Sequence, residues 1–235
     1  MPTTVVIGAG PGLGMSVAHR FGREGHEIAL ISRNAGRHPG YLAALDAAGV
    51  KATAHRADVR DRPSLLAALD AAAGHHGSID VVYYGPGAAD PDAIPAPITA
   101  TDVASAKDAM GWIYPAIDAV GAVLPGMLER GDGGLLFAGG LSAVVPVPAL
   151  GSLAISSAAL RNYVLTLHAG LADKGVYAGI LTIGGLIERG DIHRMMTAMP
   201  GPLPAGTLDP DTLADAAWTL YTDRDAPEAT FNALL

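Results

Sequence analysis

The segment GAGPGLG, residues 8–14, has the residue types and spacing of a phosphate-binding loop. It follows an apolar run at 3–8 and opens a helical pattern at 13–25. Glycines allow a sharp turn and bring backbone N–H groups and the positive end of a helix against a pyrophosphate. A tight turn without a ligand is the alternative, but the strand before the loop and the helix after it favour nucleotide binding. The residues predicted to contact the nucleotide are Gly8, Gly12, Leu13 and Gly14.

The rest of the chain predicts the elements that position this loop. Apolar strand-like runs alternate with alanine-rich helical patterns, which is typical of βαβ units and a parallel sheet. The predicted strands are residues 3–8, 27–32, 50–56, 79–85, 134–140, 177–184 and 229–234. The predicted helices are residues 13–25, 38–48, 62–73, 102–128, 152–172 and 210–222. We therefore expect a single α/β domain over residues 1–235, a Rossmann-type doubly wound parallel sheet of about seven strands with helices on both faces.

The spacing of Gly8, Gly12 and Gly14 resembles that of the short-chain dehydrogenase/reductase (SDR) family, and the resemblance extends over nearly the whole chain. It implies a nicotinamide cofactor whose further contacts come from the ends of later strands. The positions that the resemblance assigns to the cofactor are Asp58, Val59, Gly85, Gly87 and Gly184. In the family, the first two hold the adenine, and the later glycines let the backbone approach the cofactor.

Cofactor choice is expected at the end of the second strand, where the sequence reads Ser32-Arg33-Asn34. Family members that use NAD usually place an acidic residue there for the ribose hydroxyls, and none is present. A guanidinium matches a 2′-phosphate in charge and geometry, so we expect NADP(H) to bind at Ser32 and Arg33. The alternative is that Arg33 is a solvated surface residue.

The segment GSLAISSAAL, residues 151–160, aligns with the helix that carries the family's catalytic Tyr and Lys, four residues apart. In the family the Lys lowers the Tyr pKa, and the Tyr exchanges a proton with the substrate oxygen. Here Leu153 occupies the Tyr position and Ser157 the Lys position. Leu153 carries no proton, and an unactivated serine hydroxyl is too weak an acid to replace the Tyr. The resemblance is therefore to an atypical member that lacks the Tyr-x-x-x-Lys pair.

The supporting catalytic positions are also altered. Gly140 stands where the family has a serine, and Ser142 is near enough to substitute if the loop shifts. The family's helical asparagine matches either Asp108 or Trp112. The remaining candidates for a proton donor are Ser142 and Tyr114.

Two further groups of residues are weighed as site candidates. Glu188, Asp191 and His193 have no spacing that fixes a metal coordination set, so they favour a mobile polar lid over the cofactor, and no metal is expected. Four aromatic residues fall at or near the ends of strands and the catalytic helix, and one or two of them are expected to line the pocket: Tyr83, Tyr84, Trp112 and Tyr114.

Composition limits the partners. With 23 acidic residues against 15 Lys and Arg, the net charge of −8 disfavours nucleic acid and anionic membranes. The uncharged stretch at 135–160 is broken by prolines and glycines, so no membrane span is expected there. The absence of cysteine excludes disulfides, and we expect a cytoplasmic protein. Apolar surface on the helices at 102–128 and 152–172 predicts a homodimer or homotetramer.

Two classes of function remain open. The first is an NADPH-dependent oxidoreductase acting on a hydrophobic small molecule that needs no strong enzymic acid, such as an imine, an iminium ion or a conjugated alkene. The second is a non-redox protein that reuses the cofactor pocket, either a cyclase or isomerase, or a nucleotide-dependent binding or regulatory protein. Retention of the glycine loop, Arg33 and Asp58 favours the first class.

Overall fold

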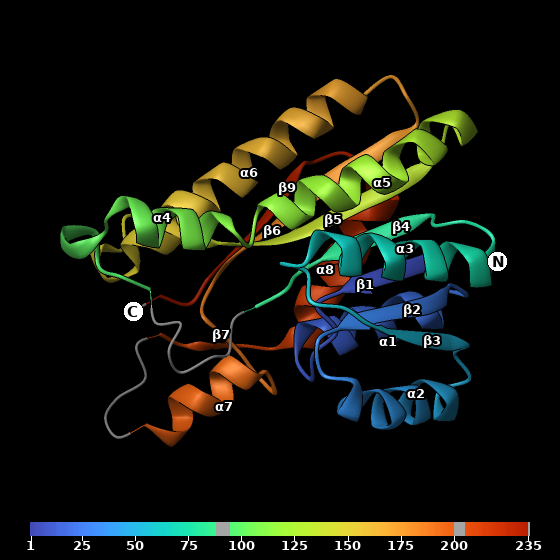
Figure 1. Ribbon diagram of the computed structural model, residues 1–235, viewed down its shortest axis with the longest axis horizontal. Coiled ribbons are helices and arrows are strands. Elements are labelled where there is room, and N and C mark those ends of the chain that lie inside the picture. The colour runs from blue at the N-terminus through green and yellow to red at the C-terminus, as the bar shows by residue number, and fades with distance from the viewer. Residues whose placement is uncertain (88–94, 200–204, 235) are drawn as a thin grey trace.

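The computed structural model describes residues 1–87, 95–199 and 205–234, and seven of its strands form one parallel sheet (Figure 1). The strand order is β3-β2-β1-β4-β5-β6-β9, and all neighbouring pairs are parallel. The strands are β1 (Thr3–Ile7), β2 (Glu27–Ser32), β3 (Ala52–Arg56), β4 (Val81–Tyr84), β5 (Gly133–Gly140), β6 (Val176–Gly184) and β9 (Glu228–Asn232). The central strands are buried on both faces, as expected of a parallel sheet covered by helices. The predicted α/β fold is confirmed.

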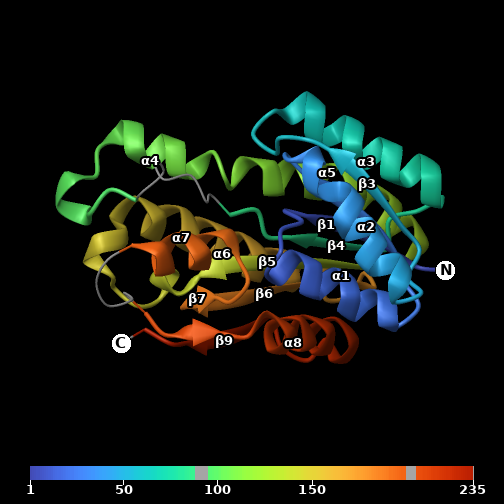
Figure 2. The same cartoon turned by 90° about the horizontal axis from the view of Figure 1, so that it is seen from below.

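Helices cover both faces of this sheet, as predicted (Figures 1 and 2). One hydrophobic core joins α3, α5 and α6 to the sheet, and a second joins α1, α2 and α8 to its other face. The helices are α1 (Leu13–Arg23), α2 (His38–Ala47), α3 (Arg62–His76), α4 (Val103–Met110), α5 (Tyr114–Arg130), α6 (Gly151–Leu171), α7 (Asp191–Ala198) and α8 (Pro210–Asp223). The order of strands reverses between β1 and β4, so their carboxyl ends form the crevice in which doubly wound proteins bind ligands.

The prediction of one helix over 102–128 is wrong, because the structure has two helices joined by a turn at 111–113. Asp102 begins α4 with a capping box, in which its side chain accepts from Ser105 N at 2.8 Å and its own N–H donates to Ser105 Oγ at 2.9 Å. Pro115 lies in the first turn of α5 and has no N–H to donate to a preceding turn. The two helices therefore have separate starting signals.

The stretch Val103–Arg130 is the one part of the described residues that is long and apolar enough, by length and composition, to cross a membrane. Of its 18-residue apolar window, 39% is buried, and the stretch is divided between α4 and α5, so it is weak evidence for a membrane span. The uncharged stretch at 135–160 divides as predicted, since β5 ends at Gly140 and α6 begins at Gly151.

A short helix and a two-stranded sheet lie beside the crevice, and the sequence did not predict them. β7 (Leu186–Ile187) pairs in parallel with β8 (Thr207–Leu208), and α7 lies between them in the chain. Arg189 turns the backbone from β7 toward α7 with a left-handed φ of 63°. The segment predicted to be a polar lid is thus partly helical, and no residue of α7 is buried.

Candidate functional site

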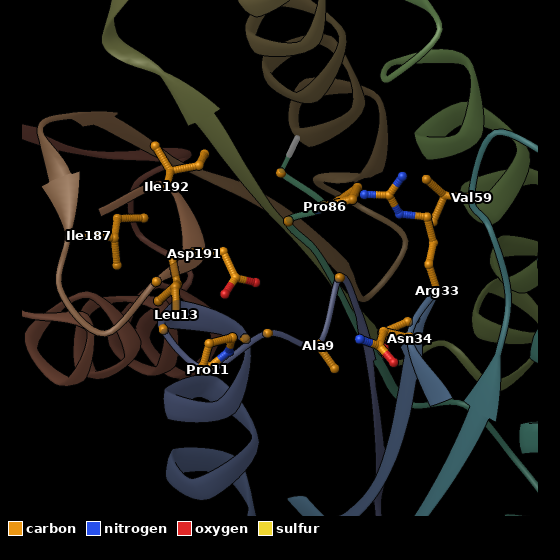
Figure 3. A pocket seen from close by; sticks show the side chains of 18 of the residues that line it. Ala9, Pro11, Leu13, Arg33, Asn34, Val59, Pro86, Ile187, Asp191 and Ile192 are labelled. Carbon is orange, nitrogen blue, oxygen red and sulfur yellow. The ribbon is translucent and has the colours of Figure 1, made fainter. Parts of the chain in front are cut away.

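A pocket of about 280 Å³ lies at the carboxyl ends of β1, β2 and β4 (Figure 3). Every residue of the glycine-rich segment 8–14 lines this pocket. Residues 31–34, at the end of β2 and just after it, line one side together with Arg37, and residues of β7 and α7 line another. Figure 3 shows Ile187 and Ile192 on the side opposite Arg33 and Val59. The pocket therefore brings the predicted phosphate loop and the end of β2 together.

Close backbone packing fixes the shape of the glycine loop. Gly8 has a left-handed φ of 95°, and its N–H and that of Ala9 both donate to Ile31 O, at 3.0 and 3.1 Å. A Cβ at Gly8 would lie 2.6 Å from Pro86 N, and one at Gly14 would lie 2.6 Å from Gly8 O. No side chain caps the start of α1 at Leu13. The loop thus presents backbone and a helix N-terminus to the pocket, which fits a pyrophosphate.

The segment that follows β2 brings two arginines to the same pocket, Arg33 and Arg37. The Arg33 guanidinium carbon lies 5.9 Å from the ring centroid of Trp112, a cation–π contact. Ser32 Oγ is 2.9 Å from His38 Nε2, and burial lowers the pKa of that histidine. Asn34 Oδ1 accepts from Gly36 N at 3.0 Å, which shapes the turn that carries the arginines.

A carboxylate from α7 reaches one of these two arginines. Asp191 Oδ2 is 2.5 Å from Arg37 Nη1, and Asp191 also pairs with Arg194 one turn along α7. Both Arg37 and Asp191 line the pocket. The hydrogen bond from Arg37 is the main reason that the pKa of Asp191 lies below its ordinary value. Of the three residues predicted to form a polar lid, Asp191 is the one that lines the pocket.

The other predicted cofactor residues divide between those that line the pocket and those that do not. Val59, Gly85 and Gly87 line it. Asp58 is exposed and does not line it, and its Oδ1 accepts a hydrogen bond from Arg60 N at 3.0 Å. Gly184 is not a lining residue either: a Cβ there would lie 2.4 Å from Leu141 Cδ2, and the next residue along the chain lines the pocket instead.

The predicted catalytic region lies at the end of β5, in the turn that follows it and on α6, outside the pocket lining. Ser142 Oγ donates to Ser157 Oγ at 3.3 Å, and Ser157 is only 4% exposed. A Cβ at Gly140 would lie 2.9 Å from Ser157 Oγ and 3.4 Å from Ser142 Oγ. Leu153, four residues before Ser157 on α6, is 37% exposed. The structure thus brings Gly140, Ser142 and Ser157 together as a small uncharged group.

Tyr114 is not part of this group. It is the first residue of α5, is 53% exposed, and does not line the pocket. Tyr83 and Tyr84 are core residues, and burial raises the pKa of both phenols. Within the residues that the structure describes, no three His, Asp or Glu side chains gather as a metal site would require.

Trp112 is the aromatic candidate that does line the pocket. Two guanidinium groups contact its ring, with the Arg33 and Arg60 carbons 5.9 and 5.4 Å from the centroid. Tyr84 Oη donates to Trp112 O at 2.6 Å, which fixes the backbone at the turn between α4 and α5. Arg60 is held in turn by Asp108 at 2.5 Å. The sequence named Trp112, but it did not predict the turn that positions it.

Comparisons with known proteins agree with this fold. The sequence model of the short chain dehydrogenase family matches residues 2–188. The chain is 25% identical over 232 residues to 2-(S)-hydroxypropyl-CoM dehydrogenase 3 of Xanthobacter autotrophicus, covering 94% of this chain and 89% of that one. A short-chain dehydrogenase/reductase structure from Burkholderia xenovorans has a TM-score of 0.86 at 22% identity, covering 98% and 95% of the two chains. An NADPH-bound short-chain oxidoreductase of Pseudomonas aeruginosa PAO1, described as containing an atypical catalytic center, has a TM-score of 0.83 at 20% identity, covering 99% and 95%.

Proposed function

Because the chain belongs to the short-chain dehydrogenase family, we propose that it is an oxidoreductase that binds NADP(H) in the pocket between β2 and α7. The observation that carries this proposal is the pair of guanidinium groups, Arg33 and Arg37, that line the pocket at the end of β2. Arginine presents several donors to a phosphate and keeps its charge at all working pH values. The segment 32–34 offers no carboxylate to the ribose hydroxyls of NAD(H).

The glycine loop supports the same proposal. Its cradle has no room for side chains at Gly8 and Gly14, and the α1 N-terminus beside it favours negative charge. Gly85 and Gly87 leave the backbone after β4 open to the pocket. A nicotinamide cofactor bound here would supply or accept a hydride, and the glycine loop and the arginines would hold its phosphates.

We propose that the substrate is a hydrophobic small molecule that needs no strong enzymic acid. In the family's alignment, Leu153 and Ser157 replace the proton-donating Tyr and its Lys, and the nearby hydroxyls of Ser142 and Ser157 are neutral and bonded to each other. An iminium carbon already carries the positive charge that a protonated carbonyl would develop, so it accepts a hydride without a proton from the protein. Leu186, Ile187 and Ile192 make the α7 side of the pocket apolar.

The NADP(H) assignment is tested by titrating NADPH and NADH against wild type and Arg33→Ala. We expect the variant to bind NADPH more weakly by about 1–3 kcal/mol, the range for a charge-assisted hydrogen bond, and to bind NADH almost as before. Arg23→Ala, which removes an exposed arginine at the far end of α1, is the matched control for net charge. Equal losses for both cofactors would contradict the assignment.

We also propose that copies of this chain associate through α5 and α6 as a homodimer or homotetramer. Five large apolar residues on these helices are exposed: Tyr114, Ile117, Leu128, Leu153 and Ile155. Exposed apolar surface is unfavourable in water, and a symmetric partner would bury it. Light scattering at micromolar concentration should give at least twice the chain mass of 23.8 kDa, and a monomeric mass would contradict the proposal.

A further inference from the structure

The ion pair between Arg37 and Asp191 joins two walls of the cofactor pocket. Arg37 follows β2, and Asp191 begins α7, 154 residues later in the chain. Their side chains are 42% and 31% exposed, and Figure 3 shows the Asp191 carboxylate pointing into the pocket. A cofactor phosphate that needs Arg37 meets a guanidinium that already holds a carboxylate.

This pair is also the polar attachment of α7 to the β2 side of the pocket. Among the described residues, Asp191 is the member of α7 whose side chain bonds to another element. The chain just before α7 is fixed separately, because Arg189 donates to Ser16 Oγ at 3.2 Å and pairs with Asp211 at 2.8 Å. No residue of α7 is buried, so the helix is held less firmly than the helices that cover the sheet.

We propose that Asp191 is a specificity-determining residue that holds Arg37 until a 2′-phosphate takes it, so that NADP(H), and not NAD(H), detaches α7 from β2. This inference rests on the proposed NADP(H) site. A phosphate placed beside Arg37 repels the Asp191 carboxylate, whereas the uncharged 2′-hydroxyl of NAD(H) does not compete for the guanidinium. Asp191 keeps Arg194 as a partner when Arg37 leaves, so its charge stays compensated and the free-energy cost of the exchange is small.

The exposure of this ion pair explains why it weakens binding of a 2′-phosphate without preventing it. An ion pair of this exposure is worth little by itself, because solvent screens both charges. Removing the Asp191 charge therefore frees Arg37 at small cost to the fold. It should strengthen binding of any ligand whose phosphate reaches Arg37 and leave other ligands unchanged.

The test uses 2′-phospho-ADP-ribose and ADP-ribose as probes, titrated by calorimetry into wild type and Asp191→Asn. We expect the variant to bind 2′-phospho-ADP-ribose about three- to tenfold more tightly and ADP-ribose within twofold of wild type. Asp173→Asn, which removes an exposed carboxylate at the end of α6, is the control for net charge and should change neither affinity. An unchanged or weaker affinity of Asp191→Asn for 2′-phospho-ADP-ribose would overturn the proposal.

Hydrogen exchange gives a second readout that does not depend on affinity. In wild type, amides 191–198 should exchange faster with 2′-phospho-ADP-ribose bound than with ADP-ribose bound, and in Asp191→Asn the two ligands should give equal rates. Equal rates in wild type would overturn the coupling to α7. A failure of the NADP(H) assignment itself would give a different result, because wild type would then bind both probes equally or bind neither. In that case both proposals would be wrong.

Discussion

The two sides of the crevice are built differently. On the β1–β2 side, a Cβ at Gly8 or Gly14 would meet backbone atoms at 2.6 Å. On the β5–α6 side, a Cβ at Gly140 would meet first the hydroxyl of Ser157, which a rotation about χ1 moves away. Backbone cannot give way as a side chain can. Positions 8 and 14 on the first side are therefore restricted to glycine, while position 140 on the second side tolerates a change of residue type.

This difference shows why binding and chemistry separate in one fold. A phosphate cradle made of backbone N–H groups survives as long as the glycines and the sheet register survive. Acid catalysis depends on individual side chains, and Leu153, which is 37% exposed, is not needed to fill the core. Three predictions test this contrast, and they are ordered by the size of the expected effect.

The largest effect concerns the catalytic side. General acid catalysis contributes about 10² to 10⁴-fold, or roughly 3–5.5 kcal/mol of barrier, so the protein should reduce ketones only at trace rates. The rate of reduction of cyclic iminium substrates should be affected much less, since their reduction needs no proton from the protein. The measurement is NADPH absorbance with wild type against matched panels of ketones and cyclic imines.

A variant sharpens this test. Leu153→Tyr with Ser157→Lys returns a phenol and an ammonium at helical spacing, and it should raise ketone reduction measurably. Leu153→Phe with Ser157→Lys is the matched control, because it differs only by the phenolic oxygen. Fast ketone turnover by wild type would contradict the interpretation and make Ser142 the first candidate for the acid. No turnover on either panel would favour a cyclase, isomerase or binding protein instead.

The next effect concerns the cofactor side. Gly8→Ala forces a left-handed φ of 95° on a residue with a Cβ and places that Cβ 2.6 Å from Pro86 N. Backbone strain and overpacking each cost about 1–3 kcal/mol, so the free energy of unfolding should fall by at least ~2 kcal/mol, and nucleotide binding should fall with it. Urea denaturation measures the first change, and a nucleotide titration measures the second.

Gly10→Ala is the matched control in the same loop. The nearest atom to a Cβ at Gly10 is Gly8 O at 3.9 Å, which is ordinary contact. Its stability should stay within about 0.5 kcal/mol of wild type. If Gly10→Ala destabilises the protein as much as Gly8→Ala does, then close backbone packing is not what restricts position 8 to glycine.

The same contrast explains what the sequence could predict. The seven strands and the glycine loop follow from short apolar runs and glycine spacing, which are local signals. The turn at 111–113 was missed because Trp112 and Ile113 continue the apolar pattern of the helices on either side. Helix α7 was missed because its 8 residues are too few to show a sustained helical period. The ion pair of Arg37 with Asp191 joins residues far apart in the chain, and no spacing rule predicts it.

The smallest effect concerns the polar support of the catalytic side. Arg161 on α6 donates two hydrogen bonds to Glu228 on β9, at 2.8 and 2.6 Å, and Thr182 Oγ1 on β6 donates a third. The bonds from Arg161 are the main reason that the pKa of Glu228 lies below its ordinary value of 4.5, and the bond from Thr182 also lowers it. Because the group is partly exposed, we expect it to stabilise the fold by about 1 kcal/mol.

The direction of the pH dependence follows from the lowered pKa. The folded state holds the Glu228 proton less tightly than the unfolded state, so the stabilisation is fully present above pH 4.5 and is lost as the pH falls through the lowered value. Glu228→Gln should therefore be less stable than wild type at pH 7, and the difference should shrink in acid. Thermal unfolding at a series of pH values measures this. A difference that stays constant down to pH 3 would mean that Glu228 acts through packing, and that the support of α6 does not depend on charge.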